Sequence, residues 1–466
     1  ANGNAKLMRF LGSSLQQSSR ALATHWRSVI KKPESATQPL LAAAAARAPR
    51  GQIEDVLLHG SEIAVRDDPD AAQSLYERLS ARLEFTDAAR AEAARLLGLA
   101  YAYRGRLSAL AWFQTYARLT YAADPPIEAH APTVDWHAVI LLSYGRWNEL
   151  LSLFDRMPGE QSGANRWRYW RARALDELGR DGEARPIFAA LATSRGYYGF
   201  LSADRIDSSY RIEDQRFEPT AAEAELFATR AGVRRARELY RLGRITEARH
   251  EWRALSAGLD DRELAIAART AKDWGWISNA VVTGARSATL RNDLGVRFPV
   301  AFREEISGAA AAQNVDPAWM YAVARQESAF MSDVHSGAGA VGLMQIMPST
   351  GKYIARKSKR KWGGRKSLED PVTNTTYGSL YLNWMEERFG GRKLLATAAY
   401  NAGPSRVNRW LPTARALPAD AWVETITINE TRKYVQRVMS YMPIYEKHLG
   451  LEPSRLRDRM QPVLPR

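Results

Sequence analysis

The sequence predicts an all-α fold whose first half is a curved α-solenoid. Three observations lead to this prediction. Apolar residues recur at helical spacing along almost the whole chain, and no run of alternating β-branched residues is long enough for a sheet. A pattern of helix, glycine, turn and second helix recurs in the first half. Such helical pairs cannot bury their apolar faces alone, so they must stack on one another.

Length and composition bound the class of protein. The chain has 466 residues, of which 45% are hydrophobic, and it contains no cysteine. Disordered, collagen-like and disulfide-stapled proteins are therefore excluded, and two to four domains are expected at about 150 residues each. The longest apolar stretch, residues 40–46, stops at Arg47, whereas a membrane span needs about 20 apolar residues. We therefore expect no transmembrane segment.

The net charge of +15 allows two interpretations. It suits a polyanionic partner such as nucleic acid, an anionic membrane surface or a cell-wall polymer. It is equally consistent with solubility spread over a large surface. The chain begins at Ala1 without a charged-then-apolar signal segment, so we expect a mature or trimmed product.

The repeated pattern in the first half centres on glycines at helix ends. Gly105, Gly145, Gly179 and Gly243 each follow a predicted helix and precede a second one. The repeat is degenerate, as expected for stacked helical hairpins. A solenoid of this kind offers a binding surface, or it serves as a rigid spacer for a site elsewhere.

Two interruptions of the helical pattern divide the chain. Charged residues and a proline break it at Arg211–Pro219, and a second break falls near Phe298. The predicted domains are therefore 1–215, an α-superhelical domain; 216–296, a helical linker domain; and 297–466, the domain that carries the sharpest motifs. The basic run at 355–361 holds no aromatic residue, which favours a solvated helix end over a nucleic-acid patch.

A helix near residue 320 carries the first candidate catalytic residue. Asp316 and Pro317 have the order of an N-cap and first helical residue. Glu327 then lies on the same face as Trp319 and Val323, close to the helix C-terminus. Partial burial and the negative end of the helix dipole should both raise its pKa, as a general acid needs. The alternative is a glutamate that pairs with an arginine at the helix end.

The segment 336–348 is glycine-rich and then apolar. Gly337, Gly339 and Gly342 satisfy the G-x-G-x-x-G dinucleotide pattern, but no strand precedes them and Pro348 follows. We therefore reject a nucleotide site. The glycines predict a tight loop whose backbone approaches a ligand or the preceding helix.

Two later segments combine aromatic and polar residues at helix ends. Tyr400 and Asn401 precede a Gly-Pro stop, and Glu430 and Tyr434 lie at the start of another helix. A tyrosine ring can stack on a sugar, and an asparagine can bond hydroxyl or acetamido groups. Taken singly, each is more often a cap or core residue.

In combination, these segments resemble the soluble lytic transglycosylases, which are periplasmic peptidoglycan-cleaving enzymes. The resemblance rests on segments in a fixed order: Gln326–Phe330, Ser336, Gly342–Pro348, Ala399–Gly403 and Glu430–Val435. It covers residues 298–446 most specifically, and weaker similarity extends to 196–201 and 239–244. The resemblance implies a ring-type α-superhelix, a helical linker domain and a lysozyme-like, mainly helical catalytic domain.

The resemblance also implies roles for individual residues. Glu327 corresponds to the catalytic acid and base. The positions that match the family's substrate-binding residues are Ser336, Gln345, Met347, Tyr400, Asn401, Glu430 and Tyr434. The implied reaction cleaves the β-1,4 bond between N-acetylmuramic acid and N-acetylglucosamine, with attack by the muramic C6 hydroxyl and a 1,6-anhydro end. No second Asp or Glu has a sequence context comparable to that of Glu327, and the nearest, Asp333, lies six residues further on in a loop. A mechanism with a single acid is therefore favoured over one with two carboxyl groups.

Alternatives remain at this point: a lysozyme-like muramidase that uses water, a non-catalytic wall-binding scaffold, and, least favoured, a nucleic-acid binder. The seven histidines show no metal-ligand spacing, so we expect neither a metal nor a cofactor. The resemblance implies peptidoglycan strands as the partner, not nucleic acid, and a monomer in the Gram-negative periplasm, soluble or peripherally wall-associated. Other cell-wall enzymes could dock on the solenoid.

Overall fold

The computed structural model describes residues 68–81, 84–121 and 130–466. The apolar stretch 40–46 lies outside them. In the described part of the chain the secondary structure is helical without any strand, and only isolated antiparallel bridges occur, such as Val341 with Ile346. The all-α prediction is therefore confirmed. The chain divides into two compact units between Ala184 and Arg185.

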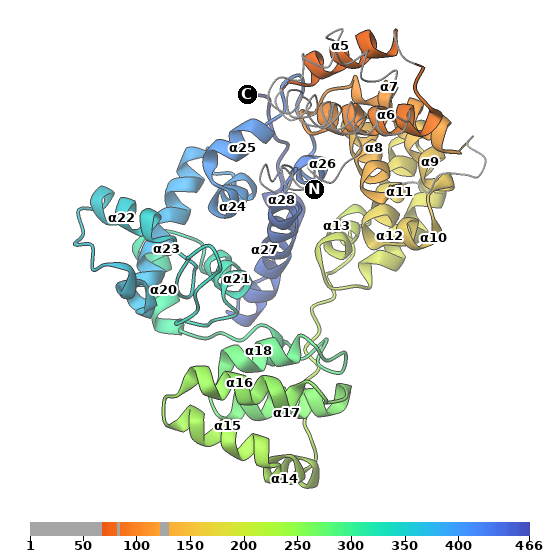
Figure 1. The fold of residues 1–466 in the computed structure, drawn as a ribbon. Helices are drawn as coiled ribbons and strands as arrows, with labels where there is room; N and C mark the ends of the chain where they lie inside the picture. The colour runs from red at the N-terminus through yellow and green to blue at the C-terminus, as the bar shows by residue number, and fades with distance from the viewer. Residues whose placement is uncertain (1–67, 82–83, 122–129) are drawn as a thin grey trace, which may run out of the picture. The chain divides into compact units, whose positions relative to one another are not determined.

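The first unit is a stack of helical hairpins. Consecutive helices from α6 to α9 pack on one another in chain order, and α11 packs on α9 (Figure 1). Its helices are α5 (Pro69–Ser80), α6 (Asp87–Ala102), α7 (Ala109–Tyr121), α8 (Ala131–Ser143), α9 (Trp147–Arg156), α10 (Gly159–Ser162) and α11 (Asn165–Glu177), and α12 (Asp181–Ala192) crosses into the second unit.

The hairpin glycines adopt the conformation that the repeat predicts. Gly105, Gly145, Gly179 and Gly243 all have φ between 65° and 72°. The amide of the following arginine bonds back five residues in each case, as Arg146 N does to Leu141 O at 2.9 Å. This is a Schellman motif, which satisfies carbonyls at the helix end and requires a left-handed residue. The sequence pattern therefore marks helix ends correctly.

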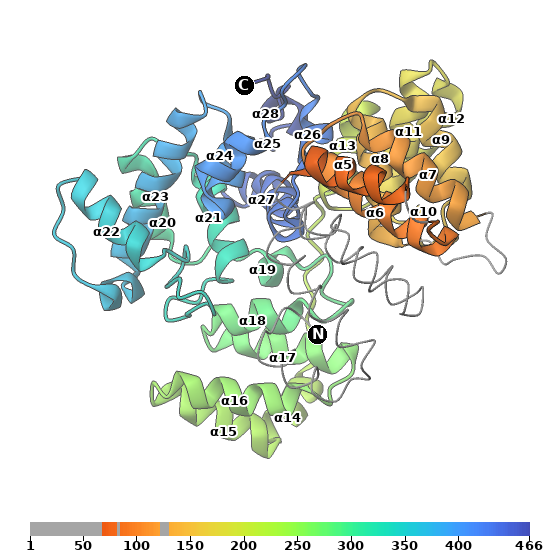
Figure 2. The ribbon, with the colours of Figure 1, turned by 45° about the horizontal axis from the view of Figure 1, so that its top comes forward.

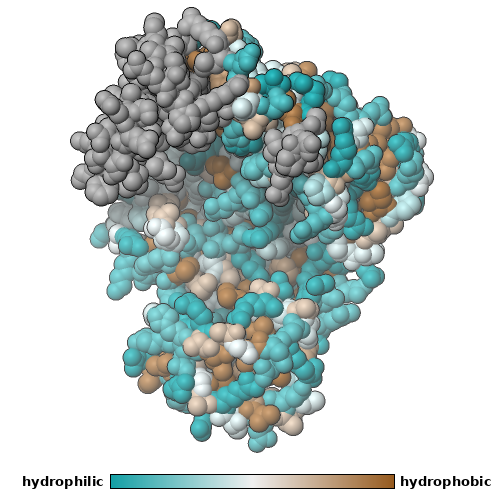
Figure 3. All heavy atoms as spheres, turned by 45° about the vertical axis from the view of Figure 1, so that its right-hand side comes forward, coloured by the Kyte–Doolittle hydropathy of each residue, from teal (hydrophilic) through white to brown (hydrophobic). Residues whose placement is uncertain are grey.

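The second unit begins with α13 and a small helical bundle. The helices are α13 (Tyr197–Arg205), α14 (Ala221–Thr229), α15 (Ala231–Arg241), α16 (Ile245–Ser256), α17 (Asp261–Asp273), α18 (Ile277–Gly284) and α19 (Leu294–Arg297). Helices α14–α18 enclose a core around Trp252, whose indole donates to Thr283 Oγ1 at 3.0 Å. On the side of the molecule that Figure 3 shows, the described residues form a largely hydrophilic surface with scattered hydrophobic side chains.

The rest of the second unit carries the candidate site. Its helices are α20 (Arg303–Ala312), α21 (Pro317–Glu327), α22 (Pro348–Lys357), the 3₁₀ helix η2 (Arg365–Glu369), α23 (Pro371–Arg388), α24 (Lys393–Ala402), α25 (Pro404–Trp410), α26 (Ala419–Thr425), α27 (Asn429–His448) and α28 (Leu456–Arg459). Helix α21 packs on the long helix α27, and α24 packs on both α23 and α27 (Figures 1 and 2).

Helix α13 packs against α27 and α28 within the second unit. Tyr198 donates to Glu424 Oε1 at 2.7 Å and accepts from Gln436 Nε2 at 2.9 Å. Residues 208–220 then lack helix, which agrees with the predicted break at Arg211–Pro219. The predicted boundaries at residues 215 and 296 stay predictions. None of the helices in the described ranges has the length and apolarity that a membrane crossing requires.

Candidate active site

Helix α21 positions Glu327 at its last turn. The Asp316 carboxylate accepts from the amides of Ala318 at 2.9 Å and Trp319 at 3.4 Å, so the predicted N-cap is confirmed. Trp319 is fully buried, and its indole donates to Thr397 Oγ1 of α24 at 2.9 Å. Glu327 is the last helical residue. The cap and the indole bond therefore fix the helix that presents this carboxyl group.

The chain turns sharply directly after Glu327. Ala329 and Phe330 have φ of 50° and 66°, in the left-handed region that side chains other than glycine rarely adopt. Phe330 is buried, and the Ser328 hydroxyl donates to Leu343 O at 2.7 Å. Local strain of this kind concentrates at functional sites.

The Glu327 carboxyl group is partly buried and meets Tyr434 of α27. Tyr434 is only 4% exposed and donates its hydroxyl to Glu327 Oε1 at 2.7 Å. Burial raises the pKa of Glu327 to about 8, although the Tyr434 hydrogen bond acts in the opposite direction. The charge of Glu430 adds a further increase. Glu327 is therefore mostly protonated at neutral pH, as a general acid must be.

Tyr400 and Asn401 lie at the end of α24, and the Tyr400 hydroxyl lies near the Glu327 carboxyl group. Tyr400 donates to Met344 O at 2.8 Å, and burial together with the charge of Glu327 raises its pKa well above the ordinary value. Asn401 Oδ1 accepts from Thr431 Oγ1 at 2.7 Å, which leaves the amide nitrogen to donate to a ligand. The structure thus brings together Glu327, Tyr400, Tyr434 and Glu430. Asn401 of α24 is anchored to α27 through its bond from Thr431.

Ser336 and Gln345 instead make hydrogen bonds within their own loop. Ser336 Oγ accepts from Ala340 N at 2.9 Å, and Gln345 Nε2 donates to Gly342 O at 2.9 Å and to Val334 O at 3.2 Å. These bonds shape the loop between α21 and α22. Met347 is 37% exposed at the N-cap of α22, and Glu430 is exposed in the first turn of α27.

The same loop depends on Asn374, which no motif in the sequence indicates. Its side chain accepts from Met344 N at 2.8 Å and donates to Val341 O and Leu368 O at 2.9 and 2.7 Å. Gly342 has φ of 82°, and a Cβ there would lie 2.3 Å from Asn374 Nδ2. The glycine therefore permits a close backbone approach, but in the structure this approach is to the buried Asn374 of α23 and not to the preceding helix.

Asp333 is bound to the helical bundle rather than free in the site. Both of its oxygens accept from Arg249 of α16, at 2.9 and 2.6 Å. Burial opposes ionisation, but the hydrogen bonds and charge of Arg249 hold the pKa of Asp333 below its ordinary value. Asp333 therefore joins α16 to the loop of the site. No local sequence pattern indicates this contact, because the two residues are far apart in the chain.

We expect Arg249→Ala to loosen this loop without unfolding the protein. A bidentate but partly exposed pair contributes about 1 kcal/mol to the free energy that keeps the loop in place. Without it the fraction of molecules with an ordered loop falls, and cleavage of a glycan substrate should fall by about fivefold. Because both residues act through one contact, Asp333→Ala and the double variant should lose no more than Arg249→Ala. Arg253→Ala, on the same helix, is the matched control. Independent, additive losses would contradict the assignment of the pair as one positioning contact.

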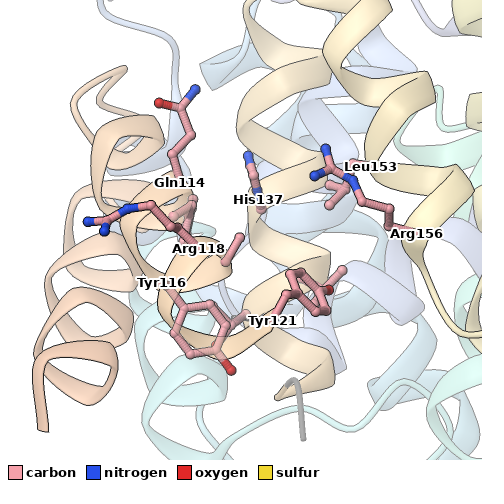
Figure 4. A pocket seen from close by; sticks show the side chains of 11 residues that line it. Gln114, Tyr116, Arg118, Tyr121, His137, Leu153 and Arg156 are labelled. Atoms are coloured by element: carbon pink, nitrogen blue, oxygen red, sulfur yellow. The ribbon is translucent and has the colours of Figure 1, made fainter. Parts of the chain in front are cut away.

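A hollow of about 340 Å³ in the first unit is a second place to consider (Figure 4). Helices α7, α8 and α9 line it, with Arg118 and Arg156 among the polar side chains. Burial lowers the pKa of His137 to about 4, so this imidazole is neutral. Among the described residues that line it, none carries a carboxyl group that could serve as an acid. Across the described ranges, no three His, Cys, Asp or Glu side chains gather as a metal site requires.

Comparisons with known proteins agree with this arrangement. The family described as "Transglycosylase SLT domain" matches residues 304–423, and the "Soluble lytic murein transglycosylase L domain" matches residues 227–290. The soluble lytic murein transglycosylases of Salmonella typhimurium and Escherichia coli K12 are each 35% identical to this chain, over 306 and 301 residues. Those alignments cover 65% and 64% of this chain but 47% and 46% of the relatives, so the chain spans about half their length.

Two solved structures are similar over almost the whole chain. An inactive mutant of lytic transglycosylase Slt from Pseudomonas aeruginosa has a TM-score of 0.87 and 33% identity, covering 97% of this chain and 72% of that one. The 70-kDa soluble lytic transglycosylase of Escherichia coli has a TM-score of 0.74 and 24% identity, covering 97% and 76%, and supports the fold alone.

Fold and side chains together define the class: a superhelical all-α protein that carries a lysozyme-like helical domain. Within that class, the chain belongs to the soluble lytic murein transglycosylase family.

Proposed function

We propose that this chain is a lytic transglycosylase that cleaves the β-1,4 bond between N-acetylmuramic acid and N-acetylglucosamine in peptidoglycan. Glu327 acts first as the general acid and then as the general base. The observation that carries the proposal is the partly buried Glu327 carboxyl group at the end of α21, which accepts a hydrogen bond from Tyr434 at 2.7 Å. Burial in this setting raises its pKa to about 8. The names of the relatives support the substrate class.

The proposed reaction needs one carboxyl group. Glu327 gives its proton to the leaving oxygen O4 of N-acetylglucosamine as the bond from that oxygen to C1 of the muramic sugar breaks. The C6 hydroxyl of the same muramic sugar then forms a bond to C1 and returns its proton to Glu327. Atoms balance without water, and Glu327 ends as it began. Asp333 is held by Arg249, which supports a mechanism that does not use it as a second acid.

The remaining residues hold the sugars in this proposal. The Asn401 amide nitrogen donates to an acetamido carbonyl, and Tyr400 offers a ring face fixed by its bond to Met344. Met347 and Glu430 contact the strand from the exposed ends of α22 and α27. Ser336 and Gln345 support the loop against which the glycan strand lies. Placing the reacting hydroxyl near C1 is a proximity effect.

The setting of the reaction is part of the proposal. Peptidoglycan carries lactyl and peptide carboxylates, which a chain of net charge +15 attracts. Action in the periplasm follows from the substrate. Docking of other wall enzymes on the superhelix and a monomeric state stay predictions.

Digestion of purified sacculi tests the proposed function. We expect soluble fragments whose muramic ends are one water lighter than reducing ends. Reducing ends alone would instead identify a lysozyme-like muramidase. Binding to sacculi without any soluble product would identify a wall-binding scaffold.

The pH dependence of cleavage tests the role of the raised pKa. Because the acid form of Glu327 is the active one, kcat/KM should fall as the pH rises through about 8. Tyr434→Phe removes a hydrogen bond that stabilises the carboxylate, so the pKa should rise and the alkaline limb should move to higher pH. The rate at neutral pH should fall because the carboxyl group is no longer oriented. An alkaline limb that stays in place in Tyr434→Phe would contradict this role.

A further inference from the structure

A row of aromatic side chains leads away from the candidate site across α24, α23 and α22. The Tyr400 ring contacts the Tyr381 ring edge-on, with centroids 5.5 Å apart. One helical turn further along α23, Trp384 contacts Tyr353 of α22 edge-on, with centroids 6.0 Å apart. Since residues three apart share a helix face, Tyr381 and Trp384 join the two contacts into one row. We call these four residues the aromatic row.

A separate observation links the two halves of the aromatic row. Burial raises the pKa of Tyr381, and the Tyr353 hydroxyl adds to that increase. Figures 1 and 2 show α22, α23 and α24 next to one another, in agreement with the helix contacts.

The outer end of the aromatic row is open to solvent and basic. Tyr353 is 43% exposed, whereas Tyr400, Tyr381 and Trp384 are partly buried. The Lys357 ammonium lies 3.8 Å from the centroid of the Trp384 ring, and the Arg356 guanidinium carbon lies 5.8 Å from that of Tyr353. These two cations belong to the basic run at 355–361, to which the proposed reaction assigns no role.

This combination fits one chemistry better than it fits simple packing. A core pair of aromatics would be buried, but Tyr353 is an exposed residue. Sugar rings present apolar faces that stack on aromatic rings, and the lactyl and peptide carboxylates of peptidoglycan attract ammonium and guanidinium groups. The row is also continuous with Tyr400, which the proposed function already places against a sugar.

We propose that Tyr353, Trp384 and Lys357 form an outer subsite that binds a peptidoglycan glycan strand at sugars remote from the cleaved bond. The subsite rests on the proposed function, because it binds the same strand. It adds affinity for long strands and none for oligosaccharides too short to extend from Glu327 to α22.

Binding measured in the Glu327→Gln background tests the subsite without turnover. The probes are a purified tetrasaccharide and long glycan strands, both from peptidoglycan. Tyr353→Ala with Trp384→Ala should weaken long-strand binding about tenfold and leave tetrasaccharide binding unchanged. Tyr353→Phe, which keeps the ring, should bind long strands as the parent does. Val372→Ala, an exposed position elsewhere on α23, is the control.

The charge contribution has its own signature. Lys357→Ala should weaken long-strand binding at low salt, and the difference should vanish at high salt, whereas Lys357→Arg should retain binding. Equal losses for both probes, or no loss for either, would overturn the subsite, provided that melting temperatures show folded variants. Failure of the wild type to cleave sacculi would overturn the proposed function alone, since the binding comparison does not depend on cleavage.

Discussion

Glu327→Gln is expected to lower the cleavage of sacculi on the order of 10³-fold, the range that a general acid–base group supplies. The amide keeps the size of the side chain and can still accept a hydrogen bond from Tyr434, but it has no proton to give to the leaving oxygen. Soluble product released over time is the measurement. Binding to sacculi should persist, because the residues that hold sugars are unchanged.

The same variant should be more stable than the wild type at neutral pH. Glu327 has a pKa of about 8 in the folded chain against 4.5 as its ordinary value, so folding favours its protonated form. That stabilisation is complete below pH 4.5 and is lost as the pH rises through 8. Glutamine never ionises, so the variant should gain on the order of 4 kcal/mol at pH 8 and nothing at pH 4. Melting temperatures across this pH range provide the measurement.

A variant that keeps substantial cleavage would remove Glu327 from the reaction. A variant that is inactive but less stable than the wild type at pH 8 would contradict the raised pKa while leaving the catalytic role intact. The two readouts therefore test the chemistry and its physical cause separately.

Asn374→Ala should have the largest effect on the structure of the site. The substitution leaves Met344 N and Leu368 O without a buried partner, whereas Val341 O keeps its bond from Ile346 N. Each unsatisfied group costs about 1–3 kcal/mol, so the loss in unfolding free energy should be on the order of 3 kcal/mol or more. Because Tyr400 bonds to Met344 O, cleavage should fall as well. Denaturant unfolding and a sacculus assay measure the two effects.

Asn374→Asp separates hydrogen bonding from packing. Aspartate has nearly the same volume and keeps the acceptor for Met344 N, but it faces two carbonyl oxygens with oxygen instead of N–H donors. We expect it to destabilise at least as much as alanine does. A mild effect of Asn374→Asp would mean that Asn374 only fills space.

Local signals in the sequence predicted the helices well. Glycines predicted the helix ends that close in Schellman motifs, and Asp316 with Pro317 predicted the start of α21, because these conformations depend on neighbouring residues. The apolar face of α21 likewise predicted a buried setting for Glu327, and the resemblance to a family located the other motifs.

Contacts between distant residues could not be predicted in this way. Tyr434 and Glu327 are 107 residues apart, and no local pattern indicates that the Tyr434 hydroxyl will contact the Glu327 carboxyl group. The same holds for Asn374 beneath the loop and for Arg249 on Asp333. Ser336 and Gln345 match substrate-binding positions by their motif, and that role stays a prediction. No local pattern indicates that their side chains also form hydrogen bonds within the loop. Sequence indicated which residues matter, and the fold shows what each one contacts.

The most direct test of the proposed reaction is digestion of sacculi in water enriched in the heavy oxygen isotope. Intramolecular attack by the C6 hydroxyl transfers no solvent oxygen, so mass spectra should show new muramic ends without label. Incorporation of one labelled oxygen at each new end would show that water is the nucleophile and would contradict a transglycosylase mechanism centred on Glu327.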